Sequence, residues 1–229
     1  MAEDGTRLDD VLAQPKRFAL LGYLASDRPL RLHRRDALLL LFWPESDEAH
    51  ARGALSQALS FLRRALGKDV IVTRGAEEVG IVTGSVTCDV DRFEAFADAE
   101  DHHHALALYR GDLLAGFHVS GCNEFDDWLS AERQRLRDRA ARAARALANR
   151  AAAAGADSTA VVAARNALLL APLDEMAAKR VLLALQGNGR PALALHEYDE
   201  FRKRLRRELG VEPSAELQRM ADSLRSGAN

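Results

Sequence analysis

Apolar residues in the first part of the chain recur with the spacing of short helices. Phe18, Leu21 and Leu24 lie three residues apart, which predicts a helix over residues 16–25 with one apolar face. The stretch 29–33 is expected to be short and extended. Residues 35–42 are apolar on nearly every side, which predicts a buried helix, and the proline that follows ends it.

A longer amphipathic helix is predicted over about residues 48–66. Ser46 or Asp47 can cap its start, because a side-chain oxygen there can accept a hydrogen bond from an amide of the first turn. Gly67 ends the helix. Its apolar stripe consists of Ala51, Leu55, Ala58, Leu59, Leu62 and Leu66.

A β-hairpin is predicted after this helix. Residues 70–73 and 79–83 are rich in β-branched side chains, and they flank a run of turn residues. Arg74 lies at the tip of this hairpin, next to Gly75. Residues 87–90 are expected to add another short strand.

The second half of the chain is predicted to be helical throughout. The expected helices are 92–110, 124–154, 158–170, 174–186, 190–209 and 214–225, separated by glycine and proline. A repeat of 34 residues aligns Ala160, Ala164 and Ala167 with Ala194, Tyr198 and Phe201. Pro172 closes the first copy where tetratricopeptide repeats carry proline, so a tetratricopeptide-like bundle is predicted.

The change of character near residue 98 predicts two domains, 1–97 and 98–229, in a mainly α-helical protein. The 229 residues are 48% hydrophobic and 29% charged, which is typical of a folded protein with a polar surface. The acidic first ten residues lack a signal-peptide core, and the longest apolar run is too short to span a membrane. Cys88 and Cys122 form no CxxC pair and are expected to be free thiols. These features predict a cytoplasmic protein with no membrane partner.

A buried helix, a short turn, a capped amphipathic helix and a hairpin form the pattern of a winged helix-turn-helix. The net charge is -2, so any contact with DNA must come from a local patch. Between residues 49 and 74 five Lys and Arg residues stand against a single acidic residue, Asp69. This stretch is therefore the predicted DNA-binding surface, although a solvated helix face shows the same pattern.

The candidate DNA-binding residues lie outside the apolar stripe of helix 48–66 and at the hairpin tip. Gln and Arg side chains can each make two hydrogen bonds to a base edge, and serine can bond either kind of edge. Glycine lowers helix propensity but allows close approach of the backbone. Arg63, Arg64 and Arg74 are expected to meet phosphates. The full set is Arg52, Gly53, Ser56, Gln57, Ser60, Arg63, Arg64 and Arg74.

The sequence gives little support for a metal site, a nucleotide-binding site or an enzyme active site. His102, His103 and His104 are consecutive, so on a helix they point about 100° apart and cannot chelate one metal ion together. Neither a phosphate-binding glycine loop nor a Gly-x-Ser-x-Gly elbow occurs, so no enzyme and no cofactor is predicted. The arginines of 133–145 could form a second nucleic-acid surface, or a solvated face paired with Glu132 and Asp138.

Four segments of the first half resemble the winged helix of the Streptomyces antibiotic regulatory protein family. They are RRDALLLLFWPESD (34–47), ALSQALSFLRRALG (54–67), VTRGAEEVGIV (72–82) and CDVDRFEAF (88–96). Three later segments resemble the bacterial transcriptional activator domain that follows it in that family. They are YRGDLLAGF (109–117), WLSAERQRLRDRA (128–140) and LRRELGVEPSAEL (205–217).

The resemblance implies a transcriptional activator that binds direct repeats in promoter DNA, as a homodimer on tandem sites, and contacts RNA polymerase. Only about 12 residues precede Ala13, so the strands with which family members begin are expected to be short or absent. No ATPase or sensor region is expected after the helical domain. The alternative is a tetratricopeptide-type adaptor whose winged helix has lost DNA binding.

Overall fold

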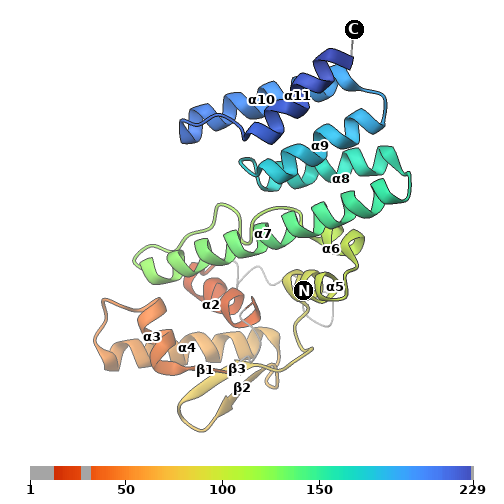
Figure 1. Cartoon of the computed structure of the whole chain (residues 1–229). Coiled ribbons are helices and arrows are strands. Elements are labelled where there is room, and N and C mark those ends of the chain that lie inside the picture. Colours follow the sequence, from red (N-terminus) through yellow and green to blue (C-terminus); the bar gives the residue numbers. More distant parts are fainter. Residues whose placement is uncertain (1–12, 27–31, 228–229) are drawn as a thin grey trace. The chain divides into compact units, whose positions relative to one another are not determined.

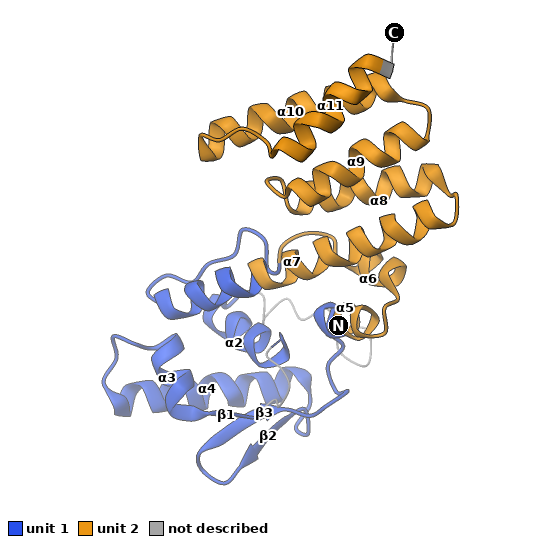
Figure 2. Cartoon of the chain, in the orientation of Figure 1, with its two compact units in different colours: residues 1–91, 113–133 blue, residues 92–112, 134–229 orange. Residues whose placement is uncertain are grey.

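The computed structural model describes residues 13–26 and 32–227, which are mainly helical (Figure 1). Tertiary contacts divide the chain into two compact units. Unit 1 comprises residues 1–91 and 113–133, and unit 2 comprises residues 92–112 and 134–229 (Figure 2). None of the described helices is long and apolar enough to cross a membrane.

The described part of unit 1 contains first helix α2 (Pro15–Ser26), strand β1 (Leu32–Arg34) and helices α3 (Arg35–Phe42) and α4 (Glu48–Leu66). Strands β2 (Ile71–Arg74) and β3 (Glu78–Ile81) follow as the predicted hairpin.

These strands form an antiparallel three-stranded sheet in the order β1-β3-β2. The strand expected at 87–90 is wrong, because α5 (Asp89–Asp98) begins there. The third strand is instead β1, from the end of the stretch 29–33. The first three residues of that stretch, and the N-terminal strands expected before Ala13, lie outside the described residues.

Helix α3 is buried on one side only, contrary to the prediction of a fully buried helix. Leu38, Leu39 and Phe42 are buried, whereas Leu40 is 68% exposed. At the end of this helix the Lys16 ammonium donates a hydrogen bond to the carbonyl oxygen of Phe42 (3.0 Å), where a cation complements the helix dipole.

The ends of α4 follow the predicted chemistry. Asp47 is the cap, and its carboxylate accepts a hydrogen bond from the amide of His50 (3.0 Å). This bond lowers the pKa of Asp47. Gly67 ends the helix with a φ of 113°, which glycine adopts readily. The predicted stripe of α4 is buried except at Leu66, which is half-buried.

Residues 113–133 belong to unit 1, because their aromatic side chains complete its core. The ring of Phe125 packs on Phe42, with centroids 5.2 Å apart, and that of Trp128 packs on Tyr23 at 4.7 Å. The Cys122 thiol donates a hydrogen bond to the carbonyl oxygen of Phe42 (3.2 Å). These compact units differ from the predicted division into 1–97 and 98–229, which stays a prediction about independently folding domains.

The single helix expected over 92–110 consists of two helices, α5 and α6 (His102–Leu108). Glu100 has a φ of 55°, which breaks the helix, and Asp101 then caps α6 by accepting a hydrogen bond from the amide of His104 (3.3 Å).

The remaining helices agree closely with the predicted ranges. They are α7 (Asn123–Ala153), α8 (Asp157–Leu170), α9 (Glu175–Gly187), α10 (Pro191–Leu209) and α11 (Ala215–Gly227). From α8 onward each helix packs against the next, as in a tetratricopeptide-like bundle (Figure 1). The six aligned repeat positions are all buried in it.

Candidate nucleic-acid interface

Helix α4 exposes one polar stripe on the side opposite its buried residues. Its members recur every three or four residues and therefore share a face: Gly53, Ser56, Gln57, Ser60 and Arg64. All five are exposed, and within the described part of the chain none of their side chains makes a hydrogen bond or ion pair. A helix face with free donors and acceptors can bond to the edges of bases.

No packing contact within the described chain explains why residue 53 of this stripe is a glycine. A Cβ atom added at Gly53 would meet no atom within 4 Å. Glycine in a helix interior is less stable than alanine by about 0.5–1 kcal/mol. Packing within the described chain therefore does not require glycine at this position, whereas close approach by an external partner would.

Arg52 lies on the flank of the stripe and is already paired. Its guanidinium donates to the carboxylates of Glu48 (2.9 Å) and Asp36 (3.1 Å). The hydrogen bond with Glu48 and the two negative charges raise the pKa of Arg52. A phosphate or a base would have to compete with these two carboxylates for the guanidinium.

Arg63 also lies on the flank, and it joins α4 to the hairpin. Its Nε donates a hydrogen bond to the carbonyl oxygen of Ile71 in β2 (3.2 Å), and the side chain is half-buried. Arg63 thus holds the strand against the helix. Arg64 and Lys68 follow as exposed basic side chains without such a bond among the described residues.

Arg74 ends β2 directly opposite Glu78, the first residue of β3. The guanidinium and the carboxylate form an ion pair of 2.5 Å at an exposed position. Arg74 lowers the pKa of Glu78 by hydrogen bonding and by its charge. The hairpin tip therefore presents a partly neutralised positive charge.

The structure thus separates the predicted site residues into two groups. The stripe of α4 brings five of them together, while Arg52, Arg63 and Arg74 are each held by other groups of unit 1. The carboxylates that hold Arg52 and Arg74 are not among the predicted features. Glu48 lies four residues before Arg52 on the same helix, a spacing that could have signalled this pair. Glu78 lies opposite Arg74 across the hairpin, so that pair follows from the strand register.

The arginines of α7 are mostly bound to groups outside their own helix. In unit 2, Arg135 and Arg139 both pair with the buried carboxylate of Glu94 in α5, at 2.7 and 2.8 Å. In unit 1, Arg133 donates to the backbone carbonyl oxygens of Leu113, Leu114 and Phe117. These arginines hold the fold together through groups on other segments, and their expected pairing with Glu132 and Asp138 stays a prediction.

Comparison with known protein families matches residues 88–225 to the bacterial transcriptional activator domain. Among solved structures, Mycobacterium tuberculosis EmbR in complex with a low-affinity phosphopeptide has a similar fold, with a TM-score of 0.68 and 21% sequence identity. The match covers 93% of this chain and 60% of the EmbR chain, so the chain spans well under the full length of that protein. The comparison with curated proteins found no match.

These comparisons confirm the expected activator domain and the expected mainly helical fold class. The matched family is one of transcription regulators, which are not enzymes. The matched range of 88–225 covers more than half of the 229 residues. The chain therefore belongs to the bacterial transcriptional activator domain family.

Proposed function

We propose that this regulator binds double-stranded promoter DNA sequence-specifically, with the exposed stripe of α4 in the major groove. The observation that carries the proposal is the stripe itself, which begins at Gly53 and whose side chains make no hydrogen bond or ion pair within the described chain. An α-helix fits the major groove, where base edges offer hydrogen bonds to its side chains. Gln57 and Ser56 would contact base edges, and Gly53 would allow the helix backbone to approach the DNA closely.

The basic side chains beside the stripe would bind phosphates. Arg64 and Lys68 are exposed near the end of α4, and Arg74 lies at the hairpin tip. Phosphate contacts position a protein on DNA and make its affinity salt-dependent. Arg52 could bind a phosphate only if its ion pairs with Glu48 and Asp36 were broken.

The family resemblance extends the proposal to the mode of regulation. It implies a cytoplasmic activator that binds direct repeats as a pair of chains and contacts RNA polymerase. So few basic side chains give a single chain weak binding at physiological salt. Two chains on adjacent sites bind more tightly because the second binding event becomes effectively intramolecular.

A protein-interaction adaptor is the second candidate, and one observation favours it. Two of the predicted DNA contacts, Arg52 and Arg74, already pair with carboxylates, which lowers the positive charge of the surface. In that case the winged helix would dock a protein.

A binding assay with matched glutamine variants tests the proposal. The full chain is titrated, at increasing salt, against DNA from upstream of its own gene and against sites selected from random duplexes. Gln57→Ala should make binding to the selected site less favourable by about 1–3 kcal/mol and relax the sequence preference. Gln186→Ala, at an exposed position of α9, is the control and should bind like the parent. No DNA binding by the parent at low salt would favour the adaptor.

A further inference from the structure

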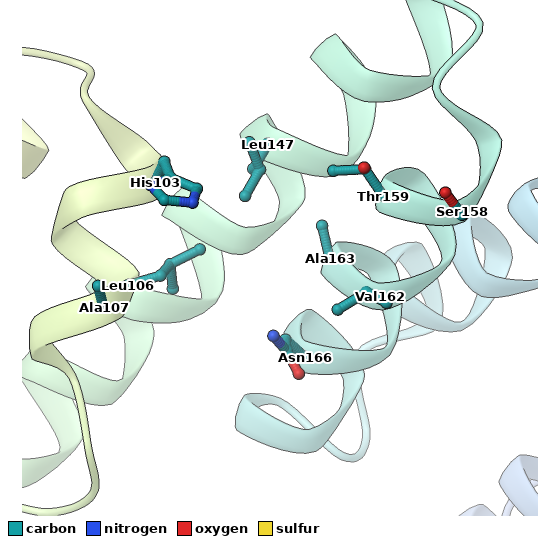
Figure 3. A pocket seen from close by; sticks show the side chains of 9 residues that line it. All are labelled: His103, Leu106, Ala107, Leu147, Ser158, Thr159, Val162, Ala163 and Asn166. Carbon is teal, nitrogen blue, oxygen red and sulfur yellow. The ribbon is translucent and has the colours of Figure 1, made fainter.

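A groove runs between α6 and α8 in unit 2, beside α7. It consists of two adjoining hollows of about 450 and 300 Å³ that share Leu106 and Asn166 in their lining. In the larger hollow, side chains of α6 and α8 line opposite sides, and Leu147 of α7 lies between them (Figure 3). The groove is remote in sequence from the stripe of α4.

Helix α8 turns a partly apolar face to this groove, although its other face is already buried. Val162 lines the larger hollow and Leu169 the smaller one, with Asn166 between them on the same face. Val162 is 60% exposed and Leu169 is 75% exposed. Exposed apolar residues gathered in one groove mark an interaction site more often than scattered ones do.

The charge of the groove limits what can occupy it. Neither hollow is lined by Asp or Glu, whereas His103 lines the larger one and the exposed Arg110 the smaller one. Because these two side chains belong to different hollows, they lie toward opposite ends of the groove. An occupant with acidic side chains next to its apolar face would be complementary to it.

The lining also favours a helix over an extended segment. A strand needs hydrogen-bond partners along its backbone, which a sheet edge would supply. This groove is lined by helices and by residues 109–111, and its hydrogen-bonding groups are scattered side chains: Ser158, Thr159 and Asn166 on α8, and His103, Tyr109 and Arg110 on the other side. A helix satisfies its own backbone hydrogen bonds, so apolar contact and a few charges suffice to bind it.

We propose that the groove between α6 and α8 binds an amphipathic helix of a partner protein, one with an apolar face bordered by acidic residues. Leu106, Val162 and Leu169 contact its apolar face, and Arg110 contacts its acidic side chains. The groove uses no residue of the proposed DNA interface, so peptide binding and DNA binding can be lost separately.

The test uses the full chain and a phage-displayed library of peptides of about 15 residues, long enough for a helix to form. An enriched peptide is synthesised with a fluorescent label and titrated by anisotropy. Its sequence should show apolar residues three and four apart with acidic residues beside them. Val162→Asp and Leu169→Asp should each weaken binding at least about tenfold.

Two further variants separate the groove from a general apolar surface. Leu183→Asp on α9 changes an exposed leucine that does not line either hollow, so it should bind the peptide like the parent. Arg110→Glu should reverse the charge preference, so that a peptide with lysine in place of its acidic residues binds better than the selected one. Circular dichroism checks that all four variants remain folded.

Several outcomes would overturn the proposal. Enrichment of basic or extended peptides would contradict the charge and helix arguments, as would equal loss of binding in the Leu183 control. A parent chain that self-associates through the groove, and becomes monomeric with Val162→Asp, would make a second copy the occupant. Octanoate, which has an apolar tail and a carboxylate, serves as a probe for a small ligand. If it binds in the groove and no peptide is selected, the occupant would be a small carboxylate and not a helix.

Discussion

Replacing Gly53 by alanine should stabilise the protein and weaken its binding to DNA. An added Cβ at this position meets no atom within 4 Å, so nothing in the described chain opposes it. Alanine is favoured over glycine in a helix interior by about 0.5–1 kcal/mol. The free energy of unfolding of unit 1 should rise by about this amount, which shifts its folding equilibrium roughly two- to fivefold.

The same methyl group would lie on the face that is proposed to enter the major groove. It would hold the backbone of α4 away from the DNA and lengthen the hydrogen bonds of Gln57 and Ser56. Since a good pair of base contacts is worth about 1–3 kcal/mol, affinity for the selected site should fall at least about fivefold. Stability and function would then change in opposite directions.

Urea unfolding followed by circular dichroism measures the stability, and fluorescence anisotropy with labelled operator DNA measures the affinity. Asn149→Ala on α7 is a matched control, because it also raises helix propensity at an exposed position away from the stripe. It should stabilise the chain without weakening DNA binding. Unchanged affinity in Gly53→Ala would refute the close approach of α4, and a loss of stability would refute the open space around Gly53.

Four further predictions concern the ion pairs, two fragments of the chain and the stoichiometry. Glu78→Gln should release Arg74, so that affinity for every DNA sequence rises at low salt and the salt slope steepens by about one; an unchanged slope in a salt titration would contradict a phosphate role. Glu94→Gln should lower the free energy of unfolding of unit 2 by about 1–3 kcal/mol, since its two arginines lose a buried charged partner. For the same reason fragment 88–229 should melt at a higher temperature than fragment 98–229 in circular dichroism, and equal melting would contradict it. The full chain should bind DNA with two tandem sites more tightly than DNA with one, and equal affinities in a gel-shift titration would exclude cooperation between chains.

The fold could be predicted from the sequence where local chemistry decides it. The span of α4 follows from its apolar period, its Asp47 cap and Gly67. The break between α5 and α6 could not be predicted, because it rests on Glu100 in a left-handed conformation that glycine or asparagine adopts more often. It also could not be predicted that residues 113–133 belong to unit 1, because this depends on aromatic contacts between residues far apart in sequence, such as Phe42 with Phe125.

The candidate site likewise has a part that local sequence predicts and a part that depends on tertiary packing. The exposed stripe of α4 could be predicted, because helix periodicity alone fixes which residues face away from the core. The pairing of Arg52 with Asp36 could not, because the two residues are 16 positions apart and meet only when α3 and α4 pack together. Sequence therefore indicates which side chains are exposed, while tertiary packing decides which of them are free to bind.

The chain passes between its two units three times, after residues 91, 112 and 133, and two of these crossings fall inside the helices α5 and α7. No single position in the chain therefore separates the two units, so neither cleavage nor fusion to another protein at one point would leave both units whole. Exchange of the N-terminal unit between regulators by simple gene fusion would divide an aromatic core and sever a helix. We therefore expect recombination to transfer the two units as one cassette, with changes of DNA target arising by substitution along α4.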